Sequence, residues 1–195
     1  MKMVTRNLDL RICLIICFIA LPFISMPVIA APPATTRIEI KARQRSGKEM
    51  TKEQCLQLIN SVNLSKDLRG AKLDEIDISG ANLVSADLSE ANLKKSILKG
   101  TNLGRANLSK ANLEGAILYE TDLNGANLNN ASLKNANLIR ANLQNATLIG
   151  ADLSKAILVD ADLSGANLTG ATMDGAKTNG AVFKDASMPD GQIHP

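Results

Sequence analysis

The residue types that usually carry out chemistry are rare in this sequence, or they lie where no partner for that chemistry is near. The 195 residues include a single histidine, His194, beside the C-terminus, so neither a histidine base nor a histidine-rich metal site is expected. Aspartate and glutamate occur throughout, and paired carboxylates can do acid–base work. They fall at the polar places of a regular pattern, where a solvated surface is their ordinary role. The sequence therefore predicts no catalytic residue, no cofactor and no metal site.

The N-terminal segment has the parts of a secretory signal peptide. Lys2, Arg6 and Arg11 precede an apolar run over 12–24, and the small-residue exit Val28-Ile29-Ala30 follows. We expect residues 1–30 to be a signal peptide that directs export to a periplasm, a lumen or the medium. The alternative is an uncleaved anchor, because the apolar stretch is just long enough to span a bilayer. Membrane contact is expected only in that case.

The three cysteines do not support a disulfide scaffold. Cleavage of the signal peptide would remove Cys13 and Cys17, and Cys55 would then have no intramolecular partner. Two roles stay open for Cys55, a small buried hydrophobic residue or a free thiol available for intermolecular pairing.

Between the signal peptide and the body of the chain, the composition predicts a linker and a cap. Residues 31–50 have two prolines directly after Ala31 and continue with a basic patch, which is typical of an extended, solvated tether. Thr51 and Gln54 have the spacing of a capping box, which predicts a helix that runs to about Asn60. Residues 51–65 are therefore expected to form a capping helix, with a turn leading into the repeats that follow.

The body of the chain is a five-residue repeat. Residues 66–190 divide into 25 pentads without an insertion. The middle residue of each pentad, its centre, is usually Leu; Ala usually stands two places before it, and Asn or Asp often stands directly before it. A period of five fits neither a helical stripe nor a long strand. Three extended residues followed by a two-residue corner do fit, and four such sides close a coil of twenty residues.

Pentads such as 81–85 (Ala-Asn-Leu-Val-Ser) and 161–165 (Ala-Asp-Leu-Ser-Gly) follow the pattern A(D/N)LXX and resemble the pentapeptide-repeat family. The resemblance implies an all-β solenoid, a right-handed quadrilateral β-helix of about six coils, over residues 66–190, with a short tail at 191–195. Leu centres would stack inside it, and a residue larger than Ala would collide with the facing wall. A bore of this width explains why only 2% of the residues are aromatic.

Some members of this family protect DNA gyrase by presenting an acidic, DNA-like rod, which gives a second hypothesis, a DNA-mimicking regulator of a DNA enzyme. The chain has 22 Lys and Arg against 19 Asp and Glu, and both signs are mixed within the repeats. A continuous acidic stripe is therefore not expected, nor is nucleic-acid binding. We favour an exported, non-enzymatic scaffold that acts through protein interactions.

One side of the predicted β-helix collects apolar residues. Residues twenty apart share a face, and one face has its centres at 78, 98, 118, 138, 158 and 178. Its outward places carry six apolar side chains: Ile97, Ile117, Tyr119, Ile139, Ile157 and Val159. An exposed apolar patch usually marks an interaction site, and Tyr119 is a plausible anchor. We expect this apolar face to bind a protein partner or a second copy; alternatively, residues 37–60 fold back over it.

Overall fold

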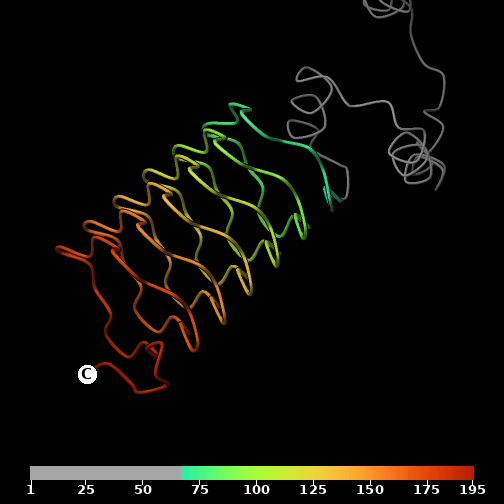
Figure 1. The fold of residues 1–195 in the computed structure, drawn as a ribbon. Helices are drawn as coiled ribbons and strands as arrows, with labels where there is room; N and C mark the ends of the chain where they lie inside the picture. The colour runs from blue at the N-terminus through green and yellow to red at the C-terminus, as the bar shows by residue number, and fades with distance from the viewer. Residues whose placement is uncertain (1–66) are drawn as a thin grey trace, which may run out of the picture. The chain divides into compact units, whose positions relative to one another are not determined.

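The computed structural model describes residues 67–195, which wind into successive coils of short turns (Figure 1). The predicted signal peptide (1–30), linker (31–50) and capping helix with its turn (51–65) lie outside the described residues. Within 67–195 there is no helix, hence none that is long and apolar enough to cross a membrane. The repeating element is a single bridge residue in every fifth place from Asp67 to Ser187.

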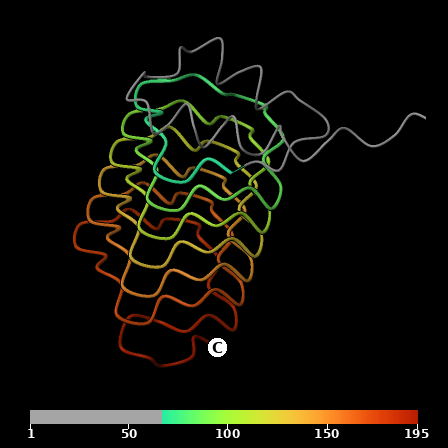
Figure 2. The same ribbon diagram turned by 90° about the vertical axis from the view of Figure 1, so that its right-hand side faces the viewer.

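Parallel bridges join each coil to the next with a constant offset of twenty residues. Asn107, for example, pairs with Asn127, and Asn127 pairs with Thr147. The backbone N–H of Leu108 donates to the carbonyl of Asn127 at 2.7 Å, and that of Asn127 donates to Ala106 at 2.9 Å. The predicted coil of four pentads is confirmed by this register, and Figure 2 shows the coils stacked on one another.

Each corner is a four-residue turn that begins at a centre. The carbonyl of Leu118 accepts a hydrogen bond from the N–H of Thr121, and the third residue of the turn, Glu120, has a φ of 54°. A positive φ at this place defines a type II turn, in which glycine is favoured. Where the corner is not glycine, as at Glu120 and Arg140, the left-handed backbone costs about 1–2 kcal/mol. Cooperative stacking of the coils must offset this cost.

Leu and Ala fill the interior, as the sequence predicts. The centres from Leu83 to Leu168 are fully buried, and so are nearly all the alanines that precede them. Buried polar groups enter only where Ser or Thr replaces Ala. Thr121 Oγ1 donates to the carbonyl of Leu98 at 2.7 Å, and every buried side-chain polar atom in the described part of the chain has a partner. Along the centres from 83 to 168 the interior is therefore filled by side chains.

The C-terminal tail turns back on the last coil. Ser187 and Ile193 form an antiparallel bridge, and the N–H of His194 donates to the carbonyl of Ala186 at 2.8 Å. The His194 ring lies 5.9 Å from the ring of Phe183. The tail predicted at 191–195 thus pairs with the end of the final coil, beside Phe183, a centre that is only partly buried.

Candidate functional site

The register of the coils brings all six residues of the apolar face to one side of the solenoid. Ile97 pairs with Ile117, Ile117 with Asn137, and Asn137 with Ile157, each one coil further on. They form the column that directly precedes the centres. Tyr119, Ile139 and Val159 follow their centres and form a second column, also at twenty-residue intervals. Asn137 interrupts the first column.

These side chains are exposed to different degrees. Ile117 is 39% exposed, whereas the other five are half-buried. Neighbours in a column are about 4.8 Å apart, so each aliphatic side chain covers part of the next. The face is therefore a shallow apolar stripe, which suits a flat partner surface better than a small ligand.

Charged side chains hold Tyr119 in place on this stripe. Arg140 Nη1 donates to the Tyr119 hydroxyl at 3.4 Å and forms an ion pair with Glu120 at 3.2 Å. The ammonium of Lys99 lies 5.5 Å from the centroid of the Tyr119 ring, within the range of a cation–π contact. The hydrogen bond to Tyr119, followed by the charge of Glu120, raises the pKa of the Arg140 guanidinium above its usual value. The phenol is therefore oriented by groups from the coils above and below it.

The sequence reasoning missed the Glu120–Arg140 pair and the Lys99 contact. Their signal was available in part, because Lys99, Glu120 and Arg140 are spaced by about twenty residues from Tyr119 or from each other. The spacing identifies neighbours, but the choice of Arg140 for both Tyr119 and Glu120 depends on side-chain conformation.

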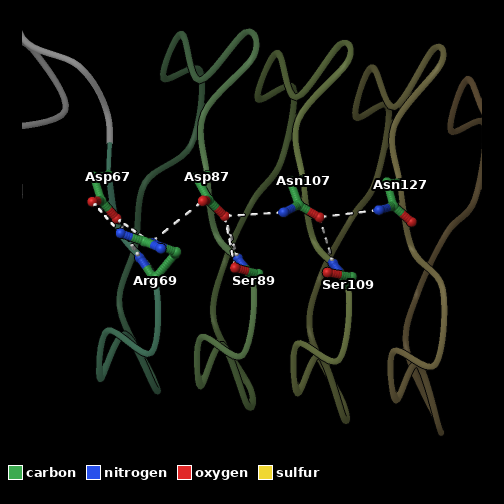
Figure 3. A network of polar contacts seen from close by, with 7 residues as sticks. All are labelled: Asp67, Arg69, Asp87, Ser89, Asn107, Ser109 and Asn127. Atoms are coloured by element: carbon green, nitrogen blue, oxygen red, sulfur yellow. Dashed lines mark hydrogen bonds and ion pairs between the residues drawn. The ribbon is translucent and has the colours of Figure 1, made fainter.

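A second side of the solenoid, which we call the asparagine face, has its centres at 68, 88, 108, 128, 148, 168 and 188 and is polar apart from Ile149. Figure 3 shows its side chains bonded in a row along the solenoid. Asn107 Nδ2 donates to Asp87 Oδ1 at 3.1 Å, and Asn127 Nδ2 donates to Asn107 Oδ1 at 3.1 Å. Thr147 Oγ1 donates to Asn127 Oδ1 at 3.3 Å. The polar groups of this face are thus largely used within the chain.

The same oxygens also support the turns. Asn107 Oδ1 accepts from the backbone N–H of Ser109 at 3.2 Å, and Asp87 Oδ1 accepts from the backbone N–H of Ser89 at 3.1 Å. At the end of the row, Arg69 binds Asp67 at 2.9 Å and lies 3.4 Å from Asp87 (Figure 3). An Asn or Asp before the centre therefore stabilises both its own turn and the adjacent coil.

Charges of opposite sign alternate along the solenoid. The residues of 91–110 include five cations and no carboxylate: Lys94, Lys95, Lys99, Arg105 and Lys110. Ion pairs join this coil to its neighbours, as between Lys94 and Glu114 at 2.9 Å, and the ammonium of Lys94 lowers the pKa of that carboxyl. A continuous acidic surface does not form across these residues. Within 67–195 no cluster of His, Cys, Asp or Glu is arranged to hold a metal.

The filled interior and the bridged coils define a four-sided β-solenoid, in which only outward residues are available for recognition. The model of the family described as pentapeptide repeats matches the chain in eight copies, and the matched segments are 67–100, 86–125, 96–135, 116–154, 136–175 and 161–190. The chain therefore belongs to the pentapeptide-repeat family.

Several solved structures are similar to this chain. HetL of Nostoc sp., described as involved in the regulation of heterocyst differentiation, is 40% identical over 66% of this chain and 68% of its own, with a TM-score of 0.42. A pentapeptide-repeat protein of the Arabidopsis thaliana thylakoid lumen is 26% identical over 67% and 77%, with a TM-score of 0.26. QnrB1, a plasmid-mediated fluoroquinolone resistance protein, is 19% identical over 63% and 67%, with a TM-score of 0.32. No curated protein matches the chain.

Proposed function

We propose that this protein is an exported, non-enzymatic scaffold that binds another protein through its apolar face. The observation that carries the proposal is the collection of six apolar side chains on one side of the solenoid, whereas the exposed Val84, Ile149 and Val182 are divided between two other faces. Apolar patches on soluble proteins are commonly interaction sites, and tyrosine is frequent among residues that dominate binding energy.

The apolar face also gives up a stabilising interaction that other faces keep. Where Asn or Asp precedes the centre, its Oδ1 accepts the N–H two residues on, as Asn107 on the asparagine face does from Ser109 at 3.2 Å. Isoleucine at 97, 117 and 157 cannot accept this bond. Replacing Asn by Ile at three of these places costs turn stability, so a role outside the fold explains the choice better than stability does.

Export rests on the sequence of residues 1–30. N-terminal sequencing of the mature protein tests it: a start near Ala31 supports a cleaved signal peptide, whereas an intact Met1 in a soluble cytoplasmic fraction contradicts export. The alternation of charge from coil to coil gives no support to the DNA-mimicking alternative, because competition for a basic groove needs a continuous run of negative charge.

Site-specific photo-cross-linking in cells of the source organism tests the binding face. A benzophenone amino acid replaces Tyr119 in one variant and Ile149 in the control, since Ile149 is 42% exposed but lies on the asparagine face. We expect position 119 to cross-link to another protein chain, whatever its mass, and position 149 to give few or no cross-links. Equal labelling at both positions, or none at 119, would refute the binding role of the apolar face.

A further inference from the structure

We infer that the partner of the apolar face is a second copy of this chain, bound antiparallel about a twofold axis. The axis would run perpendicular to the solenoid, at a level midway between Ile117 and Asn137. This inference rests on the proposed function and names the partner for the same site. It is argued from the order of residues along the face and from their charges.

A twofold axis of this kind reverses the order of the coils and keeps each column opposite its own equivalent. In the column before the centres, Ile97 then lies opposite the partner's Ile157, and Ile117 lies opposite the partner's Asn137. In the column after the centres, Tyr119 lies opposite the partner's Ile139. In the same column Val159 lies opposite the partner's Lys99, so two of the four pairs, Ile97–Ile157 and Tyr119–Ile139, join apolar side chains in each half of the dimer.

The charges that border the stripe are complementary under the same operation. Glu120 and Arg140 occupy adjacent corners beside the stripe, so Glu120 of one copy lies at the level of the partner's Arg140, and the reverse pair forms at the other side of the axis. The side chains of Arg140 and Glu120 are 59% and 45% exposed, which leaves both accessible to a second chain. The two intrachain pairs would become one network of four charges.

The ends of the face are also complementary. The column before the centres begins at Asp77 and ends at Lys177, five coils later. In the antiparallel arrangement each Asp77 is at the level of the partner's Lys177. A parallel arrangement, with the axis along the solenoid, would instead place Lys177 at the level of the partner's Lys177 and Glu120 at the level of the partner's Glu120. Charge repulsion therefore favours the antiparallel dimer.

The size of the face sets the expected affinity. Five coil spacings of about 4.8 Å give a length of about 24 Å, and three extended residues give a width of about 10 Å. This footprint is well below the roughly 800 Å² per partner of a standard interface. We therefore expect a weak, reversible dimer rather than a permanent one.

Engineered cysteines test the arrangement in the purified full chain, with Cys13, Cys17 and Cys55 replaced by serine. Ile97→Cys and Ile157→Cys are made as separate variants, oxidised singly and as a mixture at about 100 µM. We expect a disulfide-linked dimer in the mixture and almost none in either variant alone, since like positions lie several coils apart in the antiparallel dimer. A mixture of Val84→Cys and Ile149→Cys, on two other faces, is the control. Cross-linking of Ile97→Cys alone, or none in the mixture, would overturn the inference.

A charge exchange provides a second test that leaves the six apolar residues themselves unchanged. Glu120→Arg and Arg140→Glu should each lower association at least severalfold, because like charges then meet across the axis. A mixture of the two variants should associate at least as well as the native chain, since each Arg then faces a Glu of the other variant. Equal association of the single variants and the mixture in sedimentation equilibrium contradicts the proposed pairing.

The two proposals fail in different ways. A monomeric chain without the Ile97–Ile157 cross-link, together with a photo-adduct from position 119 to a different protein, overturns the dimer and leaves the binding role of the face standing. Absence of any adduct from position 119 removes both.

Discussion

The asparagine face and the apolar face share one backbone and one interior, yet their outward side chains behave differently. On the asparagine face, Asp87, Asn107 and Asn127 bond to one another and to the turns beside them. On the apolar face, Ile97, Ile117 and Ile157 have no polar atom to contribute and remain partly exposed. The difference teaches that the solenoid depends on its inward Leu and Ala, while the outward places can be given to recognition at a modest cost.

The largest expected effect on stability comes from substitutions in the leucine interior that the two faces share. Leu118 lies under the apolar face and Leu128 under the asparagine face, and both are fully buried. Leu118→Ala and Leu128→Ala should each lower the free energy of unfolding by about 2–5 kcal/mol, the usual cost of a cavity in a packed core. Urea unfolding measures both. A small loss for only one of them would show that the faces do not rest on an equivalent interior.

Substitution of a glycine at a corner should have the next largest effect on stability. Gly100 is the last residue of a pentad of the apolar face and Gly150 is the last residue of one of the asparagine face, with φ values of +61° and +66°. Alanine at either should cost about 1–2 kcal/mol through the left-handed backbone. A Cβ at 150 would also lie 2.8 Å from Asn130 Oδ1, whereas at 100 it meets open space. Thermal unfolding should therefore show the larger loss for Gly150→Ala, and the reverse order would contradict the assigned corner contacts.

Substitution of the outward residue that precedes a centre should change the free energy of unfolding in opposite directions on the two faces. Asn127→Ala removes the bonds to Asn107 and to the N–H of Asn129, so we expect a loss of about 1 kcal/mol. Ile117→Asn supplies a turn acceptor on the apolar face, and we expect stability to stay equal or to rise slightly while association falls. Chemical denaturation and sedimentation of the same samples measure both quantities. Destabilisation by Ile117→Asn of more than about 1 kcal/mol would show that Ile117 serves the fold.

The smallest expected effect is the loss of stability at low pH that comes from protonation of the Asp162 carboxylate. Burial raises the pKa of the Asp162 carboxyl, but hydrogen bonds from Ser164 and Gln144 outweigh it and hold the pKa below its ordinary value of 3.8. The stability contributed by this carboxylate is therefore present above pH 3.8 and is lost as the pH falls through the lowered value. Urea midpoints measured from about pH 5 to pH 2 should fall less steeply for Asp162→Asn than for the native chain. An unchanged slope would contradict the role of these hydrogen bonds.

Much of this could be predicted from the sequence, because a five-residue period specifies register. Counting in steps of twenty placed all six apolar residues on one side, and the bridge from Ile97 to Ile117 confirms that register. The spacing also identified the buried Leu and Ala columns. It could not give the contacts of Arg140 with Tyr119 and Glu120, which depend on side-chain conformations, or the hairpin of the tail, which lies beyond the last pentad.

Sedimentation equilibrium of the purified full chain tests most directly whether the apolar face is the site of association. The double variant Ile117→Asn/Ile157→Asn is compared with Val84→Asn/Ile149→Asn, whose two apolar residues, each 42% exposed, lie on different faces. We expect the native chain and the Val84/Ile149 variant to gain mass equally with concentration, while the Ile117/Ile157 variant stays at the monomer mass. Equal association of all three would contradict the assignment of binding to the apolar face.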